Sequence, residues 1–563
     1  MQIASLRSLW QPSLGLSIVG GALGYLEARH WRRGCCWVGR QRRGDGWVGI
    51  PEEISEAAMH GVNMAAGSLA KKVCQYLREQ RREVWLVGGY IRDQELGRET
   101  HDLDVIVSDN AIRLARRLAD HFGGAFFPLD AERDVGRALL PQAGQDLVVD
   151  ISRTRGSELV TDLSQRDFTI NAMACDLASD TPTLIDFHGG REDLKAGLIR
   201  AVSSEAFRDD PVRTLRAVRL AAELDFELEA QTAVWTRRDA SLLREISLER
   251  VQHELVRILD SPGGPDHLRM LDDLGLLGIV LPEVVDLQGV RQSPPHYLTV
   301  YEHSLETLGQ AVRLLGSLGG ERAEESVRSG VDLALGQGRD GLSSFSADLR
   351  NHLSERTSAE RTRGTMLRWA ALLHDLGKPK TRSVEVDGRV RFLRHESVGG
   401  ELATQVLRRL RFTGGEADWV GTIVRQHLRP SQLAREPVLT RRAVFRFFRD
   451  AGAAGVDTCI LSLADHLATW GPNLIADRWS RRVATTVRLL DTFFTRHKDV
   501  VAPQPLLGGR DLQYLFGVAE GPRIGLLLEA LREAQAVDEV RTRDEAEAFV
   551  YRLLQANEDG QGE

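Results

Sequence analysis

The stretch that decides the fold is Val84-Trp-Leu-Val-Gly-Gly-Tyr-Ile-Arg-Asp-Gln-Glu-Leu-Gly-Arg98, followed directly by His101-Asp-Leu-Asp-Val-Ile-Val107. Its pattern predicts a strand, a Gly-Gly turn, a short helix and a second strand that carries Asp102 and Asp104. Residues two apart on a strand share a face, so the two carboxylates project together while Leu103 points into the core.

Paired carboxylates next to a glycine turn are typical of a particular chemistry. Mg²⁺ prefers hard oxygen ligands together with the phosphates of its substrate, and Gly88-Gly89 allows backbone N–H groups to approach an anion closely. Alone, an Asp-x-Asp is usually a solvated strand end and a Gly-Gly is usually a plain turn. Their closeness and order here favour a site for metal-assisted nucleotidyl transfer.

Composition bounds the class of protein. The chain has 563 residues, with 73 Lys and Arg against 80 Asp and Glu and a net charge of −7. This length predicts several domains. The charge excludes a uniformly positive coat for nucleic acid, but it allows a local basic stripe. Five cysteines without C-x-x-C spacing fit a reducing cytoplasm, and the apolar stretch 14–26 is too short to span a bilayer, so no membrane association is expected.

The periodicity along the chain predicts an α+β protein, with a small α/β head followed by a long all-α body. Helices are expected at 65–82 and 110–122, and strands at 84–88, 103–107 and 147–151. The predicted organisation is a disordered or accessory leader (1–60), the head (65–205), a helical neck (206–290), a second helical domain (295–475) with a flexible insertion (316–364), and a helical tail (476–563).

A second group of polar residues follows in Ser164-Gln-Arg-Asp-Phe-Thr-Ile-Asn-Ala-Met-Ala174. Arg166 offers a bidentate fork to a triphosphate, and Asn171 could bond a sugar hydroxyl. A helix start capped by Asp167 is the structural alternative, and the two interpretations are compatible.

The stretch Phe207-Arg-Asp-Asp-Pro-Val-Arg-Thr-Leu-Arg216 predicts a helix with Asp209 or Asp210 as its cap and Pro211 at its first position. Asp210, Arg213 and Arg216 recur every three residues, so we expect them on one face. A carboxylate beside guanidinium groups can read the pairing edge of cytosine or adenine. The alternative is a surface ion pair.

These motifs, together with Asp186…Asp193 and Glu249-Arg…Glu254, appear in an order that resembles the bacterial class II tRNA nucleotidyltransferase and poly(A) polymerase family over about residues 80–290. The resemblance implies a polymerase-β-like head that adds C, C and A, or A alone, to RNA 3′ ends. It implies that Asp102 and Asp104 hold Mg²⁺ and activate the 3′-hydroxyl, with Asp150 as a candidate third carboxylate. The nucleotide-binding residues implied are Gly88, Gly89, Arg92, Arg166, Asp167, Asn171, Asp210, Arg213 and Arg216.

Two departures from the family pattern bear on the product. Asp209 stands where the family more often has Glu, which bears on base selection. Residues 146–166 are compact, whereas a longer loop in the family accompanies full CCA addition. CC-only and A-only addition therefore stay open beside CCA addition.

A second metal site is indicated by Trp369-Ala-Ala-Leu-Leu-His-Asp-Leu-Gly-Lys378, in which His374 and Asp375 are adjacent. Such mixtures bind transition metals or Mg²⁺, although a lone His is commonly an ordinary helix residue. With His303 and Asp465 the pattern resembles the HD phosphohydrolase superfamily, and it implies an HD domain within 295–475. His395 and His427 match the extra histidines of its metal-rich members. A hydrolase acting on phosphates at RNA ends or on nucleotides is the activity implied.

The tail also resembles the helical end of HD-containing tRNA nucleotidyltransferases. Basic helical faces at 408–411 and 441–449 are candidates for an RNA-binding stripe. The sequence thus predicts a cytoplasmic enzyme that adds CCA, or part of it, to tRNA or another RNA 3′ end from CTP and ATP. A poly(A) polymerase, and a phosphohydrolase whose head only binds RNA, are the alternatives.

Overall fold

The computed structural model describes residues 68–80, 83–156, 158–178, 183–318 and 330–559. The predicted leader at 1–60 lies outside the described residues. Within the part of the chain that is described, none of the helices combines the length and the apolar composition needed to cross a bilayer.

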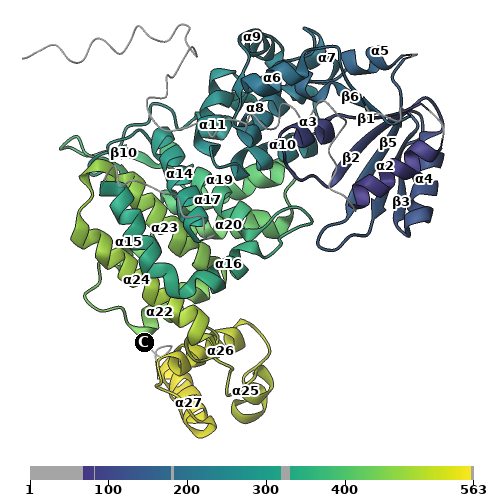
Figure 1. The fold of residues 1–563 in the computed structure, drawn as a ribbon. Helices are drawn as coiled ribbons and strands as arrows, with labels where there is room; N and C mark the ends of the chain where they lie inside the picture. Colours follow the sequence, from purple (N-terminus) through teal and green to yellow (C-terminus); the bar gives the residue numbers. More distant parts are fainter. Residues whose placement is uncertain (1–67, 81–82, 157, 179–182, 319–329, 560–563) are drawn as a thin grey trace, which may run out of the picture. The chain divides into compact units, whose positions relative to one another are not determined.

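A seven-stranded sheet forms the head, in the order β3-β4-β5-β2-β1-β6-β7 (Figure 1). Strands β2 and β5 pair in parallel, and the other neighbours pair antiparallel. The strands are β1 (Val84–Val87), β2 (Asp102–Val107), β3 (Ala125–Asp130), β4 (Val135–Leu140), β5 (Leu147–Arg153), β6 (Met173–Asp176) and β7 (Leu184–Asp186). The helices of the head are α2 (Leu69–Glu79), α3 (Gly89–Glu95), α4 (Ala111–Phe122), α5 (Leu159–Ser164) and α6 (Gly190–Ala196).

The central strands are apolar because both of their faces are covered, which is the pattern expected of a buried strand. Leu86, Leu103 and Val105 are buried in the head core. The pairing register places Asp104 beside Asp150 of β5 and opposite Val87 of β1. The strand, turn, helix and strand predicted from 84–107 are confirmed, and this register positions the head site.

Beyond the head the chain is helical, as expected. The neck contains α7 (Ala206–Asp209), α8 (Arg213–Leu224), α9 (Ala230–Asp239), α10 (Leu248–Asp260), α11 (Gly264–Asp273), α12 (Leu277–Val280), α13 (Pro282–Val285) and the short strands β8 (Leu198–Ile199) and β9 (Glu227–Leu228). The body contains α14 (Val300–Leu318), α15 (Gly330–Leu342), α16 (Ser346–Ser354), α17 (Arg363–Leu373), α18 (Lys378–Thr381), α19 (His395–Arg409), α20 (Gly414–Gln426), α21 (Arg429–Leu433), α22 (Arg441–Ala451), α23 (Ala454–Trp470), α24 (Ala476–Thr495) and the hairpin β10 (Arg382–Val384) and β11 (Val390–Phe392).

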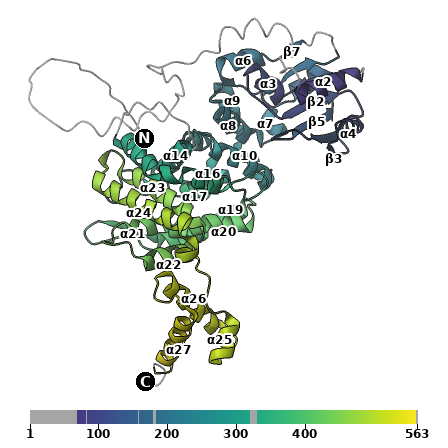
Figure 2. The same ribbon diagram turned by 60° about the horizontal axis from the view of Figure 1, so that its bottom comes forward.

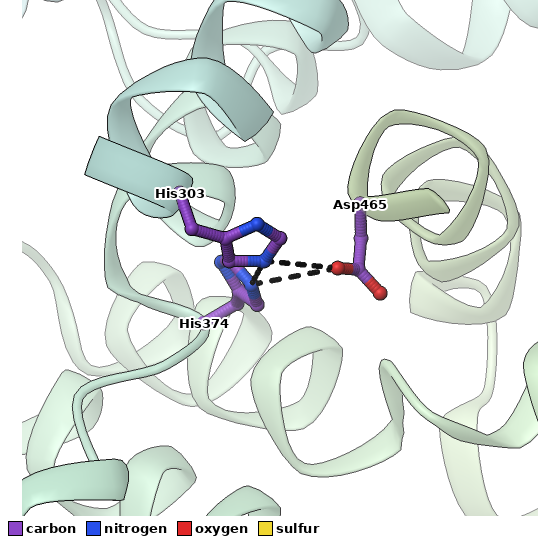
Figure 3. A group of neighbouring side chains, drawn as sticks. All are labelled: His303, His374 and Asp465. Atoms are coloured by element: carbon purple, nitrogen blue, oxygen red, sulfur yellow. Dashed lines mark hydrogen bonds and ion pairs between the residues drawn. The ribbon is translucent and has the colours of Figure 1, made fainter. Parts of the chain in front are cut away.

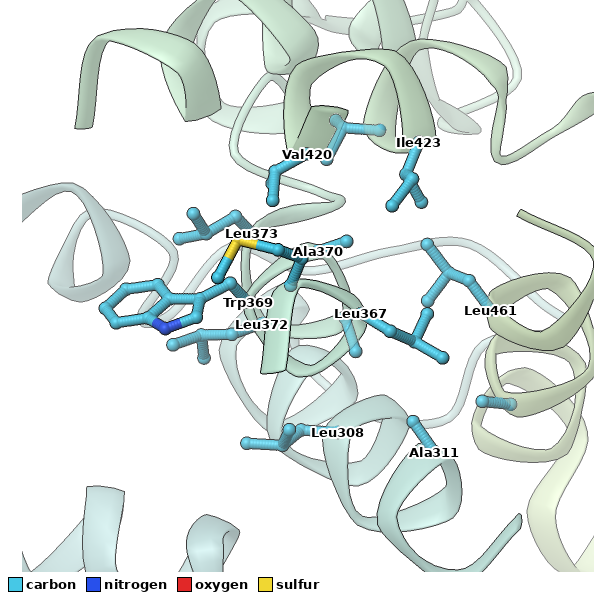
Figure 4. Close-up of a cluster of buried hydrophobic side chains, with 14 of the residues drawn as sticks. Leu308, Ala311, Leu367, Trp369, Ala370, Leu372, Leu373, Val420, Ile423 and Leu461 are labelled. Carbon is cyan, nitrogen blue, oxygen red and sulfur yellow. The ribbon is translucent and has the colours of Figure 1, made fainter. Parts of the chain in front are cut away.

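Helix α17 is the centre of the body core. Leu367, Trp369 and Ala370 are fully buried. Figure 4 shows these side chains among Leu308 of α14 and Ile423 of α20. The core therefore brings together helices that are far apart in the sequence, and the end of α17 carries His374.

The flexible insertion predicted at 316–364 is wrong for residues 330–354, which form α15 and α16. Leu342, Phe345 and Leu349 are buried in the body core. These helices have few apolar residues among Gly and Ser, so their sequence shows little helical periodicity. They form because a few buried side chains are enough to hold a helix against neighbouring helices that supply the rest of the core. Residues 319–329 lie outside the described part.

Of the tail predicted at 476–563, helix α24 packs into the body core. The remaining helices are α25 (Gly509–Phe516), α26 (Pro522–Ala536) and α27 (Arg543–Asp559), drawn together as one group in Figure 2. Acidic side chains of this group pair with the arginines of α22. Arg446 Nη2 lies 2.6 Å from Oε1 of Glu533, and Arg442 Nη2 lies 2.7 Å from Oε1 of Glu539. The face of α22 proposed for RNA is thus occupied by ion pairs within the chain.

The basic face at 408–411 is likewise engaged. Arg408 pairs with Asp418 at 2.9 Å, and Arg409 pairs with Glu283 at 2.8 Å. Arg411 lies 3.5 Å from Glu249. The arginines of both faces are thus engaged in ion pairs within the chain, and an RNA-binding stripe on these faces stays a prediction.

Glu416 connects the start of α20 to a loop that approaches the neck. Its carboxylate accepts hydrogen bonds from the side chains of Arg361 and Thr357 and from the backbone N–H of Thr413. Arg361 also donates to Gln252 of α10. Burial opposes ionisation, but these donors lower the pKa of Glu416 to about 2.

We expect Glu416→Gln to lower the free energy of unfolding at pH 7 by about 2–3 kcal/mol, because the lowered pKa is a stability contribution of the charged form. That contribution is complete above the unfolded-state pKa and is lost as the pH falls through the folded-state pKa. Calorimetric unfolding should show the gap between wild type and variant shrinking below about pH 4.5. The control is Asp418→Asn in the same helix, an exposed pair worth about 0–1 kcal/mol. Equal effects of the two variants would contradict this role of Glu416.

Candidate active site and metal centre

Gly88, Asp104 and Arg166 converge in the head. Gly88 has φ +74°, the left-handed region that glycine tolerates, and it begins the turn before α3. A Cβ atom at Gly88 would lie 2.8 Å from Oδ2 of Asp104 and 3.1 Å from Nη1 of Arg166. Only glycine therefore lets the turn lie against this acidic and basic pair.

The carboxylates of the head cluster on adjacent strands. Asp104 is half-buried and Asp102 is exposed at the start of β2. Burial raises the pKa of Asp104, and the negative charges of Asp150 and Asp102 raise it further, while Arg166 opposes the shift. A divalent cation would offset this mutual repulsion, so the donor set fits Mg²⁺.

Asp150, the candidate third carboxylate, has a strong partner of its own. Arg137 of β4 forms a two-point ion pair with it, with both N–O distances at 2.7 Å. Sequence reasoning missed Arg137, since only the β4–β5 register places it opposite Asp150. Asp150 therefore contributes its charge to the cluster while Arg137 holds its orientation.

A continuous hydrogen-bonded chain joins the predicted nucleotide-binding residues. Arg92 donates to Asn171 at 2.9 Å, and Asn171 donates to Asp167 at 3.1 Å. Arg216 then donates to Asp167 at 3.0 Å. Burial opposes ionisation of Asp167, but Arg216 and Asn171 lower its pKa to about 2. The four residues are thus brought together as predicted, and they are mutually oriented.

Asp167 does not cap a helix, however. It accepts the N–H of Phe168, and the short turn of helix that follows has no side-chain cap. Arg166 is held by Asp162 of α5, with Nε 3.3 Å from its Oδ2. Arg92 forms a close two-point contact with Asp93 as well. Gly89 is the first residue of α3 and lies beside Arg92.

The predicted base-reading face differs from expectation. Helix α8 begins at Arg213 after Val212 and has no side-chain cap, so Asp210 lies before the helix and caps nothing. Asp210 pairs with Arg250 at 2.7 Å. The alternative prediction of a surface ion pair between Asp210 and Arg213 is therefore wrong as well, because the carboxylate of Asp210 binds Arg250 of α10 instead.

Both arginines of α8 are anchored. Arg213 is buried and donates to the carbonyl groups of Gln165 and Ala206 at 2.9 and 3.2 Å. Arg216 lies between Asp167 and Glu254, with Nε 3.3 Å from Oε1 of Glu254. These contacts tie the start of α8 to the head.

In the body, His303 of α14, His374 at the end of α17 and Asp465 of α23 meet (Figure 3). Nε2 of His303 lies 3.3 Å from Nε2 of His374 and 3.1 Å from Oδ1 of Asp465. Asp375 lies 3.2 Å from His374. The four residues predicted from the HD pattern are thus brought together, buried and within reach of one cation.

His395 and His427 complete the cluster. The rings of His374 and His427 are 5.2 Å apart between centroids, and those of His395 and His427 are 5.4 Å apart. The Nδ1 atoms of all three lie 2.6–2.9 Å from backbone carbonyl groups, which positions them as donors. In a neutral ring this places the proton on Nδ1 and leaves Nε2 available to a metal, which is the tautomer that a metal ligand needs. Burial opposes the charged form of His374, but Asp375 and Asp465 raise its pKa.

The electrostatics agree with a metal centre. Burial lowers the pKa of His427 to about 3 and lowers that of His395 as well, so both rings are neutral at pH 7. Burial opposes ionisation of Asp375, but His374 and Lys378 hold its pKa well below the usual range. Neutral imidazoles with ionised carboxylates fit a divalent cation. His296, which stacks edge-on at 5.2 Å from His303, was missed because nothing in its local sequence distinguishes it.

Three family models match the chain. Residues 84–200 match the poly A polymerase head domain, residues 225–287 match a probable RNA- and SrmB-binding site of polymerase A, and residues 300–470 match the HD domain. Similar solved structures include a CCA-adding enzyme in complex with ATP (TM-score 0.54, 20% identity, 86% of this chain and 95% of that one) and a Thermotoga maritima CCA-adding enzyme complexed with tRNA (TM-score 0.51, 19%, 89% and 98%). At these identities the likeness shows the fold.

The curated relatives are more similar in sequence. An A-adding tRNA nucleotidyltransferase of Deinococcus radiodurans is 35% identical over 83% of this chain and 94% of its own length. A CC-adding tRNA nucleotidyltransferase of Thermus thermophilus is 33% identical over 83% and 93%. The chain therefore belongs to the tRNA nucleotidyltransferases, the enzymes that add nucleotides to RNA 3′ ends without a template, and it carries an HD domain in addition.

Proposed function

We propose that this enzyme adds one kind of nucleotide to the 3′ end of tRNA, either C or A, and not the whole CCA sequence. The observation that carries this proposal is the short connection between β5 and α5. Strand β5 ends at Arg153 and α5 begins at Leu159, so few residues are available to reshape the site between a CTP-selecting and an ATP-selecting state.

The contacts around α8 support the same conclusion. Switching base would require the Arg213 and Arg216 side chains to move relative to the head. Arg213 is held by backbone carbonyl groups and Arg216 by two carboxylates, and breaking buried contacts of charged groups is costly. The two relatives described above, which match over most of the chain, are named for partial addition. Relatives named multifunctional CCA protein match over 58% of this chain.

In the proposed reaction Asp102 and Asp104 hold Mg²⁺, and Arg92 and Arg166 bind the triphosphate. Bound Mg²⁺ supplies charge neutralisation at the phosphates and favours the deprotonated 3′-hydroxyl. A bond forms between the 3′-oxygen and the α-phosphorus, the bond from that phosphorus to the bridging oxygen breaks, and pyrophosphate leaves. The hydroxyl proton is released to water. Asp210 and Arg213 are the residues proposed to select the base.

The test uses purified enzyme with two tRNA substrates, one ending before CCA and one ending in CC, with CTP and ATP supplied separately and together. We expect extension of one substrate by one nucleotide type only. Complete CCA synthesis in the mixture would contradict the proposal, and so would addition of C to the first substrate together with A to the second.

A second candidate function is favoured by the buried His–Asp cluster. We propose that the HD site binds a divalent metal and hydrolyses phosphate esters, because one candidate ligand atom from each of His303, His374 and Asp465 lies within 4.8 Å of the others. The cluster opens onto a cavity of about 760 Å³ that is lined by Asp375, His395 and Asp465. A substrate phosphate therefore has a route to the metal ligands.

A further inference from the structure

The cavity at the HD site has a surplus of positive charge. Its lining includes two carboxylates, both among the proposed metal-binding residues, and the seven cationic side chains Lys378, Arg389, Arg391, Arg435, Arg478, Arg481 and Arg482. Lys378 pairs with Asp375 and Arg391 pairs with Glu385, each at 2.6 Å, so the surplus is carried by the other five. The negative charge of a single phosphate bound at a metal ion could be balanced by far fewer cationic side chains.

Several of these guanidinium groups have no acidic partner. Within the described residues, Arg389, Arg435, Arg478 and Arg481 form no ion pair with an acidic side chain. All four side chains are exposed. Arg478 lies over the ring of Trp470 at 4.9 Å, which orients it without neutralising it. By contrast, the arginines of α22 are paired with acids of α26 and of the residues that follow it. The unpaired charge is therefore a local property of the cavity.

The deeper part of the cavity is positive as well. Arg482 is buried and donates to Ser462 at 2.9 Å and also to Ser431. Burial lowers its pKa to about 10, with a further contribution from the charge of Arg435. Mutual repulsion between unpaired cations is tolerated where a multivalent anion binds.

We propose that the HD cavity binds a compact anion with three or more linked phosphate groups, such as a nucleoside polyphosphate or an inorganic oligophosphate. This inference rests on the proposed HD site and names its substrate class. A polymer is disfavoured, because the two basic helical faces that could lead RNA toward the body are occupied by ion pairs. A cavity of about 760 Å³ suits a small ligand.

The test is calorimetric titration of the full chain in EDTA with phosphate, pyrophosphate, tripolyphosphate and GTP. We expect tripolyphosphate to bind at least about 100-fold more tightly than phosphate, and Arg435→Ala with Arg481→Ala to weaken tripolyphosphate about 10-fold or more. The control is Arg117→Ala with Arg532→Ala, which removes the same charge from exposed positions outside the cavity. Any contribution of the head to binding is common to all these proteins.

Equal affinity for phosphate and tripolyphosphate would overturn the inference, and so would equal losses in the two double variants. A 3′-phosphorylated single-stranded RNA that displaces tripolyphosphate at a much lower concentration would overturn it in favour of an RNA site. Tighter binding of GTP than of tripolyphosphate identifies a nucleoside-bearing ligand, and similar affinities identify the phosphate chain. Hydrolysis of p-nitrophenyl phosphate with Mn²⁺ tests the proposed hydrolase separately. Failure of the polyphosphate-binding proposal therefore does not imply failure of the hydrolase proposal, and the reverse also holds.

Discussion

Asp104→Asn is expected to lower nucleotide incorporation by at least about 1,000-fold, or about 4 kcal/mol of transition-state stabilisation. The amide keeps the shape of the carboxylate but removes an anionic ligand from the proposed metal site of the head. Folding should not suffer. Burial raises the pKa of Asp104, so stability is lost as the pH rises from the unfolded-state pKa to the folded-state pKa, and the loss is complete at higher pH. Removing that charge leaves the unfolding temperature at pH 7 equal or higher.

The matched control is Asp146→Asn, in the exposed connection between β4 and β5, which removes the same charge near the same sheet. Incorporation of labelled CTP or ATP into tRNA and thermal unfolding are measured for both variants. Near-normal incorporation by Asp104→Asn would refute the assignment. Equal losses in both variants would show that net charge, and not metal ligation, matters.

Asp375→Asn is expected to weaken divalent metal binding at the HD site by more than about 100-fold, which exceeds the 10–100-fold effect typical of outer-sphere partners. Asp375 contacts His374 at 3.2 Å and His395 at 3.5 Å, so its carboxylate lies at the centre of the ligand group. Metal content after dialysis against Mn²⁺ or Co²⁺, measured by atomic spectroscopy, and metal-dependent hydrolysis of p-nitrophenyl phosphate give two readouts.

Glu396→Gln provides the control for the HD site. Glu396 lies 3.7 Å from Nδ1 of His395, the nitrogen turned away from the cluster, so this variant should keep its metal. A wild-type protein that holds no divalent ion in the HD site, or an Asp375→Asn variant that holds as much as wild type, would contradict the proposed metal centre.

The strand–turn–helix–strand around Gly88 could be predicted from sequence because all of its signals are local. Apolar runs, a glycine turn and an Asp-x-Asp alternation lie within one short stretch, and the structure places Asp104 and Gly88 as that pattern implies. The His374-Asp375 pair was likewise marked by the end of its helix. The distant candidate ligands His303 and Asp465 could be added only through the resemblance to the HD pattern.

The ion-pair partners that could not be predicted from the sequence depend on how the strands and helices pack in the folded protein. Arg137 faces Asp150 only because β4 and β5 align in one register. Arg250 takes the carboxylate of Asp210 from a different helix. The arginines of α22 formed a candidate RNA-binding face in the sequence, and the structure pairs them with Glu533 of α26 and with Glu539 after it. In each case the partner comes from another strand or helix, beyond the reach of local spacing.

The most direct test of the central claim is anomalous diffraction from crystals soaked with Mn²⁺ and a non-hydrolysable analogue of CTP or ATP. The account predicts a manganese peak about 2 Å from carboxylate oxygens of both Asp102 and Asp104, with the analogue's phosphates beside Arg92 and Arg166. A peak at the HD cluster shows that the soak succeeded. Manganese at the HD cluster, with an analogue bound elsewhere and no metal at Asp102 and Asp104, would contradict the account.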